Sequence, residues 1–269
     1  MEPVATGPAG FKQIVVIGHG LIGGSIALAA AERLPGIDIL TLDRGDDIEG
    51  AADADLIVLA TPIGQIIELL PLLARVVSGA TLVTDTGSTK SAIVQAAGNM
   101  RFIGGHPIAG AATSGRGGAR ADLFADRRWI LTPRDASEPT DVARLEHFVE
   151  TLGARAQLLP AEEHDRLFAF LSHLPQLVVS ALMDVVGSHV GEEALAMAGP
   201  GLRDTTRLAT SPPDIWRDIV STNDPQLRSA LDALISLLTT MRDDPSGEAL
   251  AQIFVSAARW KLALDDGSR

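Results

Sequence analysis

A histidine and a serine each follow a short apolar run in the first half of the chain. His106 stands in GGHPIAG (residues 104–110), and Ser88 stands in TDTGSTK (residues 84–90). An imidazole at the carboxyl end of a parallel strand faces the ligand crevice, and histidine ordinarily titrates near neutrality, so it can accept a proton from a hydroxyl. His106 is therefore a candidate base. Ser88 fits a helix N-cap as well as it fits a functional role.

A second group of polar side chains lies in the last two fifths of the chain. Arg203 and Arg207 are four residues apart, which predicts that they share one face of a helix. Two guanidiniums there could bind a carboxylate through paired hydrogen bonds, and the alternative is an ordinary solvated face paired with Asp204. His164 and His173, nine residues apart, are predicted near one side of a helix. Their spacing matches no zinc signature, so no metal site is predicted.

A glycine motif near the N-terminus predicts a dinucleotide site. Residues 18–23, GHGLIG, follow a β-branched run and open a helical pattern, as the G-x-G-x-x-G turn requires. Asp43, 20 residues after Gly23, can accept hydrogen bonds from ribose hydroxyls and repels a 2′-phosphate. NAD is therefore favoured, although Arg44 could pair with a 2′-phosphate and keeps NADP open. The predicted cofactor contacts are Gly18, Gly20, Leu21, Ile22, Gly23, Asp43, Arg44, Thr61, Pro62 and Ser88.

The elements that position these residues alternate between strand and helix patterns up to residue 160. This alternation predicts an α/β fold with a parallel, doubly wound sheet of the Rossmann type. Only twelve residues separate Asp43 from Leu56, which predicts a loop or a single turn instead of a crossover helix. Strands are predicted at 13–17, 37–42, 56–60, 81–84, 101–103, 129–131 and 154–158, and helices at 21–34, 63–77, from about 88, and at 142–152.

The pattern changes after Pro160. Residues 161–264 show helical periodicity interrupted by proline and glycine, without a convincing strand. We therefore expect two domains, a dinucleotide-binding domain over residues 1–160 and an all-helical domain over residues 161–269.

Composition narrows the class of protein further. The net charge of −12 argues against nucleic acid and anionic membranes as partners and leaves a small anionic molecule possible where arginines gather. The chain has no cysteine, which excludes thiolate chemistry, and no tyrosine, which excludes a tyrosine–lysine acid pair. We see no signal peptide and no apolar run near the ~18 residues that span a bilayer. These observations predict a cytoplasmic protein.

Seven stretches together resemble the prephenate/arogenate dehydrogenase family, also called cyclohexadienyl dehydrogenases, of tyrosine biosynthesis. They occur in the order that the family has and extend from the first strand into the last third of the chain. The stretches are GHGLIGGS (18–25), TDTGSTK (84–90), GGHPIAG (104–110), EEHD (162–165), SHLP (172–175), GLRDTTRLA (201–209) and IWRDI (215–219).

The resemblance implies NAD(P)-dependent oxidative decarboxylation of prephenate or arogenate, giving 4-hydroxyphenylpyruvate or tyrosine. It implies that His106 accepts the hydrogen bond of the ring hydroxyl and that Ser88 bonds to the same hydroxyl and to the nicotinamide end. It also implies a homodimer formed through the helical domain. The residues implied to bind or surround the substrate are Arg207, His173, His164, Arg203, Asp204, Gln176 and Trp216.

Three alternatives remain open from the sequence. The substrate could be an amino-substituted prephenate analogue. The chain could instead be a β-hydroxyacid dehydrogenase or an imine reductase, but those enzymes place a catalytic lysine in the helical half, and here the only lysine after residue 90 is Lys261. A dinucleotide sensor without catalysis is the third alternative, which has no use for Ser88, His106, His173 and Arg207 together.

Overall fold

The fold of the chain is that of a computed structural model, which describes residues 10–110 and 115–266. The chain divides into two compact units, Met1–Asp224 and Pro225–Arg269. The first unit contains every residue that the sequence singles out for chemistry.

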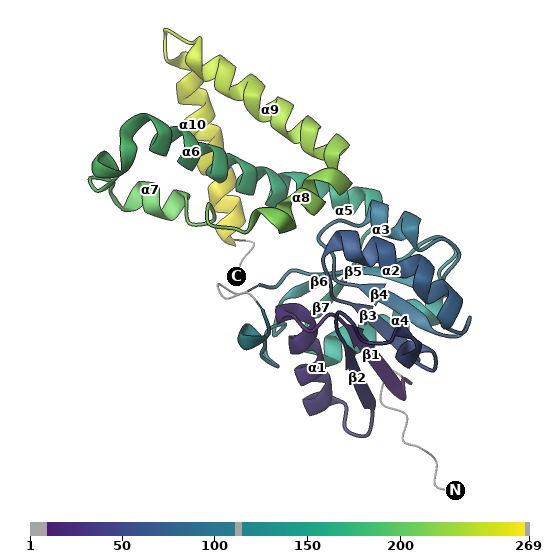
Figure 1. Cartoon of the computed structure of the whole chain (residues 1–269). Coiled ribbons are helices and arrows are strands. Elements are labelled where there is room, and N and C mark those ends of the chain that lie inside the picture. Colours follow the sequence, from purple (N-terminus) through teal and green to yellow (C-terminus); the bar gives the residue numbers. More distant parts are fainter. Residues whose placement is uncertain (1–9, 111–114, 267–269) are drawn as a thin grey trace, which may run out of the picture. The chain divides into compact units, whose positions relative to one another are not determined.

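A seven-stranded sheet forms the centre of the first unit, with the strand order β2-β1-β3-β4-β5-β6-β7 (Figure 1). Strands β1 to β5 are parallel, whereas β6 is antiparallel to β5, and β7 runs parallel to β6. The winding reverses between β1 and β3, and ligands of such sheets bind outside the carboxyl ends of the strands at this point. The strands are β1 (Gln13–Ile17), β2 (Asp38–Leu42), β3 (Leu56–Leu59), β4 (Leu82–Asp85), β5 (Phe102–Pro107), β6 (Arg128–Thr132) and β7 (Arg155–Leu158).

The doubly wound fold expected from the sequence is confirmed, with two corrections. The expectation of a wholly parallel sheet is wrong at one edge, because the described residues between β5 and β6 contain only the short 3-10 turn η2 (Arg116–Gly118) and no crossover helix, which a parallel connection needs. In addition, β5 extends four residues beyond the predicted 101–103. His106 therefore lies within β5, opposite Ile130 of β6.

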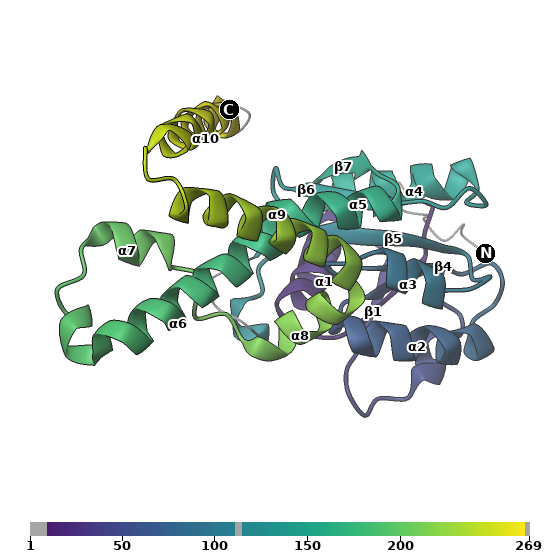
Figure 2. The ribbon, with the colours of Figure 1, turned by 90° about the horizontal axis from the view of Figure 1, so that it is seen from above.

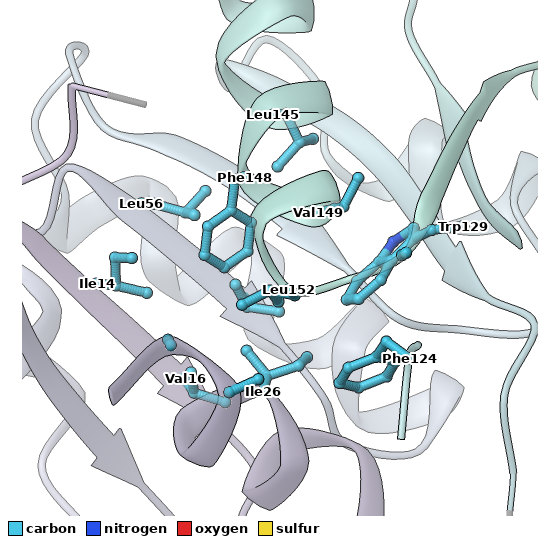
Figure 3. Close-up of a cluster of buried hydrophobic side chains, with 14 of the residues drawn as sticks. Ile14, Val16, Ile26, Leu56, Phe124, Trp129, Leu145, Phe148, Val149 and Leu152 are labelled. Atoms are coloured by element: carbon cyan, nitrogen blue, oxygen red, sulfur yellow. The ribbon is translucent and has the colours of Figure 1, made fainter. Parts of the chain in front are cut away.

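Alternating strand residues supply two hydrophobic cores, one on each face of the sheet. Ile14 and Val16 point into one core and Val15 into the other, as the two-residue period of a strand requires. Figure 3 shows Phe148 and Trp129 in the first core, and Figure 2 shows α2 and α4 on opposite sides of the strands. The helices that flank the sheet are α1 (Leu21–Arg33), α2 (Ile63–Val76), α3 (Ser91–Ala96) and α4 (Pro139–Thr151).

The connection from β2 to β3 is the single turn that the sequence predicts. One 3-10 turn, η1 (Ile48–Ala51), replaces the crossover helix, and the carboxylate of Asp47 caps it by accepting the N–H of Glu49 at 3.0 Å. Ile48 of this turn lines a cavity at the carboxyl end of β2.

Helices form the rest of the first unit. No strand follows Leu158 in the described part of the chain, which agrees with the predicted helical half. A π-helical segment, η3 (Ala169–His173), separates α5 from α6, and Gly191 with φ +74° bends α6. The helices are α5 (Ala161–Phe168), α6 (Leu174–Leu195), α7 (Pro200–Thr205) and α8 (Pro213–Thr222).

The expectation that no segment is long and apolar enough to cross a bilayer is wrong. The continuous helix Ala161–Leu195 has 35 residues and a window of mean hydropathy 1.5, and only 17% of that window is buried. Leucine, valine and alanine recur on all sides of α6, and Val185 and Val190 are exposed. Several exposed apolar side chains on one helix are typical of an interface with another molecule.

The second unit is a helical hairpin of α9 (Asp224–Arg242) and α10 (Glu248–Asp266). Asp244 organises the turn between them, since its carboxylate accepts the N–H groups of Gly247 and Leu250 at 3.1 and 3.0 Å. The side chains of Phe254 and Trp260 on α10 are more than half exposed.

Candidate active site

The glycine motif forms the turn between β1 and α1. Gly18 has φ +103°, and a Cβ there would lie 2.6 Å from the carbonyl oxygen of Ala60. A Cβ on Gly23 would lie 1.9 Å from the carbonyl oxygen of Gly18, because α1 passes this close to the turn. Nothing lies within 4 Å of the corresponding point at Gly20. Gly18 therefore permits the tight turn, Gly23 permits close packing of the helix, and Gly20 leaves an open approach for a ligand.

The N-terminus of α1 suits a diphosphate. Gly20 is the N-cap, no side chain caps the helix, and its first turn carries no acidic residue. The first N–H groups of a helix lack partners within it, and together with the helix dipole they attract an anion. Leu21 and Ile22 pack their side chains against the core, which leaves only their backbone for ligand contacts.

A cavity of about 290 Å³ opens beside this turn, at the carboxyl ends of β1 and β2. Its wall carries the carboxylates of Asp43, Asp46 and Glu68 and one guanidinium, that of Arg44. Asp43 accepts the N–H of Arg44 at 2.8 Å, and Asp46 accepts the N–H of Asp43 at 2.7 Å, which fixes the turn after β2. Of the predicted cofactor residues, Gly18, Asp43, Arg44 and Thr61 line the cavity, and Pro62 is the N-cap of α2.

A fully buried ion pair between Lys90 and Asp85 holds the end of β5. Lys90 donates from Nζ to the carboxylate of Asp85 and to the carbonyl oxygen of Gly105, the latter at 2.6 Å. Asp85 in turn accepts the N–H of Gly105 at 3.0 Å. Both polar backbone groups of the residue before His106 are thereby held, which fixes where β5 presents the imidazole.

Helix α5 brings a second imidazole to His106. Nδ1 of His106 lies 2.8 Å from Nε2 of His164, and Nδ1 of His164 lies 2.9 Å from Oδ1 of Asp165. The ring of Phe168 packs against both imidazoles, with centroid distances of 4.9 Å to His106 and 4.4 Å to His164. Nε2 of His106 makes no hydrogen bond to any residue that the structure describes.

The surroundings keep this pair of imidazoles neutral. Burial lowers the pKa of His106 well below 6.5, and the nearby His164, Lys90 and His173 lower it further. Burial also lowers the pKa of His164, against the opposing effect of the hydrogen bond to Asp165. A neutral imidazole keeps a lone pair, so His106 can accept a proton or a hydrogen bond at neutral pH.

His173 ends the π-helical segment and is 1% exposed. Nδ2 of Asn223 lies 3.3 Å from its Nδ1 and also donates to the carbonyl oxygen of Asp165 at 2.9 Å. The ring of Trp216 approaches it edge-on at 6.2 Å. Burial lowers the pKa of His173 to about 4. Its Nε2 is buried without a hydrogen-bond partner among the described residues, which makes it a group that a ligand could satisfy.

The interpretation of Ser88 as a helix N-cap is wrong. Helix α3 begins at Ser91, and the carboxylate of Asp165 accepts the N–H groups of Lys90 and Ser91 at 2.7 and 2.8 Å. A carboxylate from α5 thus takes the place of a local cap. Ser88 is half-buried in the turn before α3, and its backbone is near enough to raise the pKa of His173 against the effect of burial.

Gln176 is buried on the first turn of α6. Its amide nitrogen donates to the carbonyl oxygen of Leu208 at 2.9 Å and to Oγ of Ser180 at 3.2 Å. Its amide oxygen accepts the hydroxyl of Ser211 at 3.2 Å. The side chain therefore ties the chain after α7 to α6, and only the second lone pair of its oxygen remains for a ligand.

The prediction that Arg203 and Arg207 share one helical face is wrong, because α7 ends at Thr205. Arg207 lies in the turn that follows, and its N–H approaches the carbonyl oxygen of Asp204 at 3.5 Å. Both guanidiniums and the carboxylate of Asp204 are exposed. Neither guanidinium makes an ion pair within the described ranges, so both remain available for an anionic ligand.

Four residues that the sequence analysis did not assign complete the site, namely Asp85, Lys90, Asp165 and Asn223. The first three lie in the TDTGSTK and EEHD stretches, but nothing within those stretches distinguishes these residues from their neighbours. Asp85 and Lys90 pair with each other five residues apart, but the contacts of Lys90 with Gly105 and Asp165 span up to 75 positions, and no local spacing indicates them. Asn223 belongs to none of the stretches and gave no signal.

The fold and the site define a nucleotide-binding α/β protein whose following helices supply a buried histidine network. The chain belongs to the prephenate dehydrogenase family. Residues 16–158 match the family's nucleotide-binding domain, and residues 160–253 match its dimerization domain.

Individual relatives agree with this assignment. The chain is 32% identical to a prephenate dehydrogenase of Bacillus subtilis over 93% of this chain and 76% of the relative. It is 30% identical to a cyclohexadienyl dehydrogenase of Zymomonas mobilis over 94% and 96%.

Two solved structures are similar over almost their whole length. The prephenate dehydrogenase of A. aeolicus in complex with hydroxyphenyl propionate and NAD+ has a TM-score of 0.84 at 25% identity and covers 95% of this chain and 98% of its own. The arogenate dehydrogenase of Synechocystis has a TM-score of 0.78 at 29% identity and covers 93% and 99%.

Proposed function

We propose that the protein catalyses the NAD-dependent oxidative decarboxylation of prephenate, of arogenate, or of both, giving 4-hydroxyphenylpyruvate or tyrosine. The observation that carries this proposal is the state of His106. Its imidazole is neutral, Nδ1 lies within hydrogen-bond distance of His164, and Nε2, at the carboxyl end of β5, has no partner among the described residues. This is the position in a doubly wound sheet where a bound substrate meets a cofactor.

The role of His106 follows from the electrons of the reaction. A hydride leaves the ring carbon that bears the hydroxyl, the bond to the ring carboxylate breaks, and its electron pair completes the aromatic ring while carbon dioxide departs. When bound, a nicotinamide ring accepts the hydride. Positive charge develops at the hydroxyl as the hydride leaves, and a hydrogen bond to Nε2 of His106 stabilises this charge. Loss of carbon dioxide then removes the charge, and the oxygen retains its proton as a phenol.

Other residues would orient the substrate. We assign Ser88 to the hydroxyl and the nicotinamide end, on the family resemblance and on its proximity to His173. Arg207 would hold a substrate carboxylate, with Arg203 and Asp204 beside it. His173 would supply a polar contact through Nε2, which has no partner among the described residues, and Gln176 through the second lone pair of its amide oxygen. Trp216 would form an apolar wall.

NAD is the proposed dinucleotide, with NADP as a weaker alternative. Gly20 leaves the space that a diphosphate needs, and the cavity after β2 carries three carboxylates against the single guanidinium of Arg44. A 2′-phosphate would meet net negative charge there. The A. aeolicus relative binds NAD+ in its solved structure.

We further propose a homodimer in the cytoplasm, formed through the helical domain after residue 160. The match to a dimerization domain and the exposed apolar side chains of α6 and α10 support this arrangement. The apolar helix Ala161–Leu195 does not favour a membrane location, because His164 and Asp165 at its start bind residues of the nucleotide-binding domain.

One assay tests the proposed activity. Purified full-length protein is mixed with prephenate or arogenate and with NAD+ or NADP+, and the absorbance of the reduced dinucleotide is followed together with release of carbon dioxide. We expect at least one substrate to give equal amounts of reduced dinucleotide and carbon dioxide, and the rate to be higher with NAD+ than with NADP+. Dinucleotide binding without turnover on either substrate, or on an amino-substituted analogue, would support the sensor alternative and overturn the proposal.

A further inference from the structure

We infer that Asp165 fixes the proton positions on two imidazoles in series, His164 and then His106, so that Nε2 of His106 always presents its lone pair. Asp165 and His164 are then positioning residues for the proposed acceptor. The inference deepens the proposed function, but it concerns the protein without substrate and can be tested there.

The series starts at the carboxylate of Asp165. It accepts the N–H of Lys90 at 2.7 Å and that of Ser91 at 2.8 Å. Burial raises the pKa of Asp165, but the hydrogen bonds from His164, Ser91 and Lys90 outweigh it, and the pKa lies below its ordinary value. An ionised carboxylate has only acceptors. Nδ1 of His164, 2.9 Å away, must therefore carry a proton and donate it.

The second step follows from the single N–H of a neutral imidazole. With its proton on Nδ1, His164 can only accept at Nε2. Nδ1 of His106 lies 2.8 Å from that atom, so it must be the donor, and Nε2 of His106 is left as the bare acceptor. Phe168 stacks on the ring of His164 with an interplanar angle of 18°, which holds the ring in the plane that both hydrogen bonds require.

The neighbouring His173 provides an internal comparison. Nδ2 of Asn223 has two protons, one for the carbonyl oxygen of Asp165 and one for Nδ1 of His173. Nδ1 of His173 is therefore an acceptor, and its proton sits on Nε2. The two imidazoles that face the proposed site have opposite character, since His106 accepts and His173 donates.

The arrangement also affects the reaction. When Nε2 of His106 accepts the hydrogen bond of the increasingly positive substrate hydroxyl, its Nδ1–H bond to His164 strengthens, and the imidazole is polarised toward the carboxylate of Asp165. The opposite tautomer of His106 would offer an N–H to the substrate hydroxyl and could not act as acceptor. Loss of the acceptor tautomer of His106 should lower kcat by up to the ~10²–10⁴-fold that a positioned base contributes.

The experiment measures proton positions directly. Full-length protein with 15N-labelled histidine is studied without substrate at pH 7.5 by long-range 1H–15N correlation, with His106→Asn and His173→Gln as assignment variants. We expect Nδ1–H forms for His106 and His164 and the Nε2–H form for His173. An Nε2–H or doubly protonated His106 in the unmodified protein would overturn the inference.

Two variants of His164 form a matched pair. His164→Gln retains an oxygen that can accept from Nδ1 of His106, whereas His164→Phe removes it. We expect His106 to keep its tautomer in His164→Gln and to lose it in His164→Phe, with kcat falling much further than KM changes in the second variant only. If both variants behave alike, the link through His164 is wrong. Should His164→Phe not fold, the spectrum of the unmodified protein still decides.

Failure of the proposed function gives a different result. A protein that is inactive on prephenate, on arogenate and on an amino analogue, yet shows the Nδ1–H form of His106, would overturn the proposed function and leave this inference standing.

Discussion

Nδ1 of His106 and Nε2 of His164 lie 2.8 Å apart, although the two residues are 58 positions apart in the sequence. The contact joins the last part of β5 to the first helix after the sheet. It leaves one ring nitrogen of His106 for a ligand, and the first prediction concerns that nitrogen.

His106→Asn should lower kcat by about 10²–10⁴-fold, because an amide oxygen is a weaker acceptor than the imidazole nitrogen for the hydrogen bond of a hydroxyl that becomes positive. Dinucleotide affinity should remain unchanged, since His106 is not part of the glycine turn. Steady-state rates and a fluorescence titration with dinucleotide measure the two quantities. His147→Asn, on the exposed side of α4, is the control. Unchanged turnover in His106→Asn would remove this residue from the mechanism.

Gly20→Ala and Gly23→Ala should distinguish a glycine that leaves room for the dinucleotide from one that the fold itself requires. A Cβ at Gly20 meets no atom of the described residues, so the variant should keep its free energy of unfolding to within about 1 kcal/mol, the cost of alanine at an N-cap, and lose dinucleotide affinity. A Cβ at Gly23 would lie 1.9 Å from a carbonyl oxygen, so this variant should also lose about 1–3 kcal/mol of stability. Urea unfolding and dinucleotide titration distinguish them. Equal affinity in Gly20→Ala and the unmodified protein would contradict the proposed diphosphate position.

Arg207→Ala should raise the KM for the substrate about 10- to 100-fold, because a charge-assisted hydrogen bond contributes roughly 1.5–3 kcal/mol. The kcat should change far less, since the carboxylate is bound before and during the reaction. Arg217→Ala is the matched control, because Arg217 is exposed and pairs with Asp214 at 3.3 Å. An unchanged KM in Arg207→Ala would show that another group binds the carboxylate.

Lys90→Met should destabilise the protein by about 3–5 kcal/mol, because it leaves the carboxylate of Asp85 buried and unpaired. The double variant Asp85→Asn/Lys90→Met should recover part of this loss. The exposed pair Lys261–Asp265 offers the control, and Lys261→Met should leave the free energy of unfolding nearly unchanged. Urea titrations of the four proteins test the prediction, which requires a clear difference between the two single variants.

The stability of the protein should fall between pH 6.5 and pH 4. The pKa of His173 is about 4 in the folded protein and 6.5 in the unfolded chain, so the unfolded state binds more protons in this range. The contribution of His173 to the free energy of unfolding is complete above pH 6.5 and is lost as the pH falls through 4. In all it amounts to something on the order of 3 kcal/mol. Urea unfolding at pH 7.5 and 4.5 measures the slope. His173→Gln should flatten it, and an equal slope in both proteins would exclude His173 as the cause.

Local patterns indicated most of the sheet and the glycine turn, because each depends on neighbouring residues. The alternation of Val15 with Ile14 and Val16 sets which face each side chain takes, and the glycine spacing sets the turn. The direction of β6 was not readable, because it depends on a connection that lacks a crossover helix.

The site, like the fold, has features that local sequence predicts and features that depend on packing between distant elements. His106 was recognisable from its place at a strand end, but its contact with His164 depends on how α5 packs against β5. The prediction that His164 and His173 lie near one side of a regular helix is wrong, because nine residues at about 100° each would place them on opposite faces. The π-helical segment Ala169–His173 widens the turn between them, and both side chains are buried. No sequence period indicates such an insertion.

The antiparallel course of β6 places its last residue, Thr132, opposite Gly104, at the edge of the sheet away from the glycine turn. The loop that follows carries Ala136, which is exposed. Since the chain contains no cysteine, Ala136→Cys would create a unique thiol. A fluorescent dye attached there would report tumbling and assembly of the protein without obstructing its chemistry.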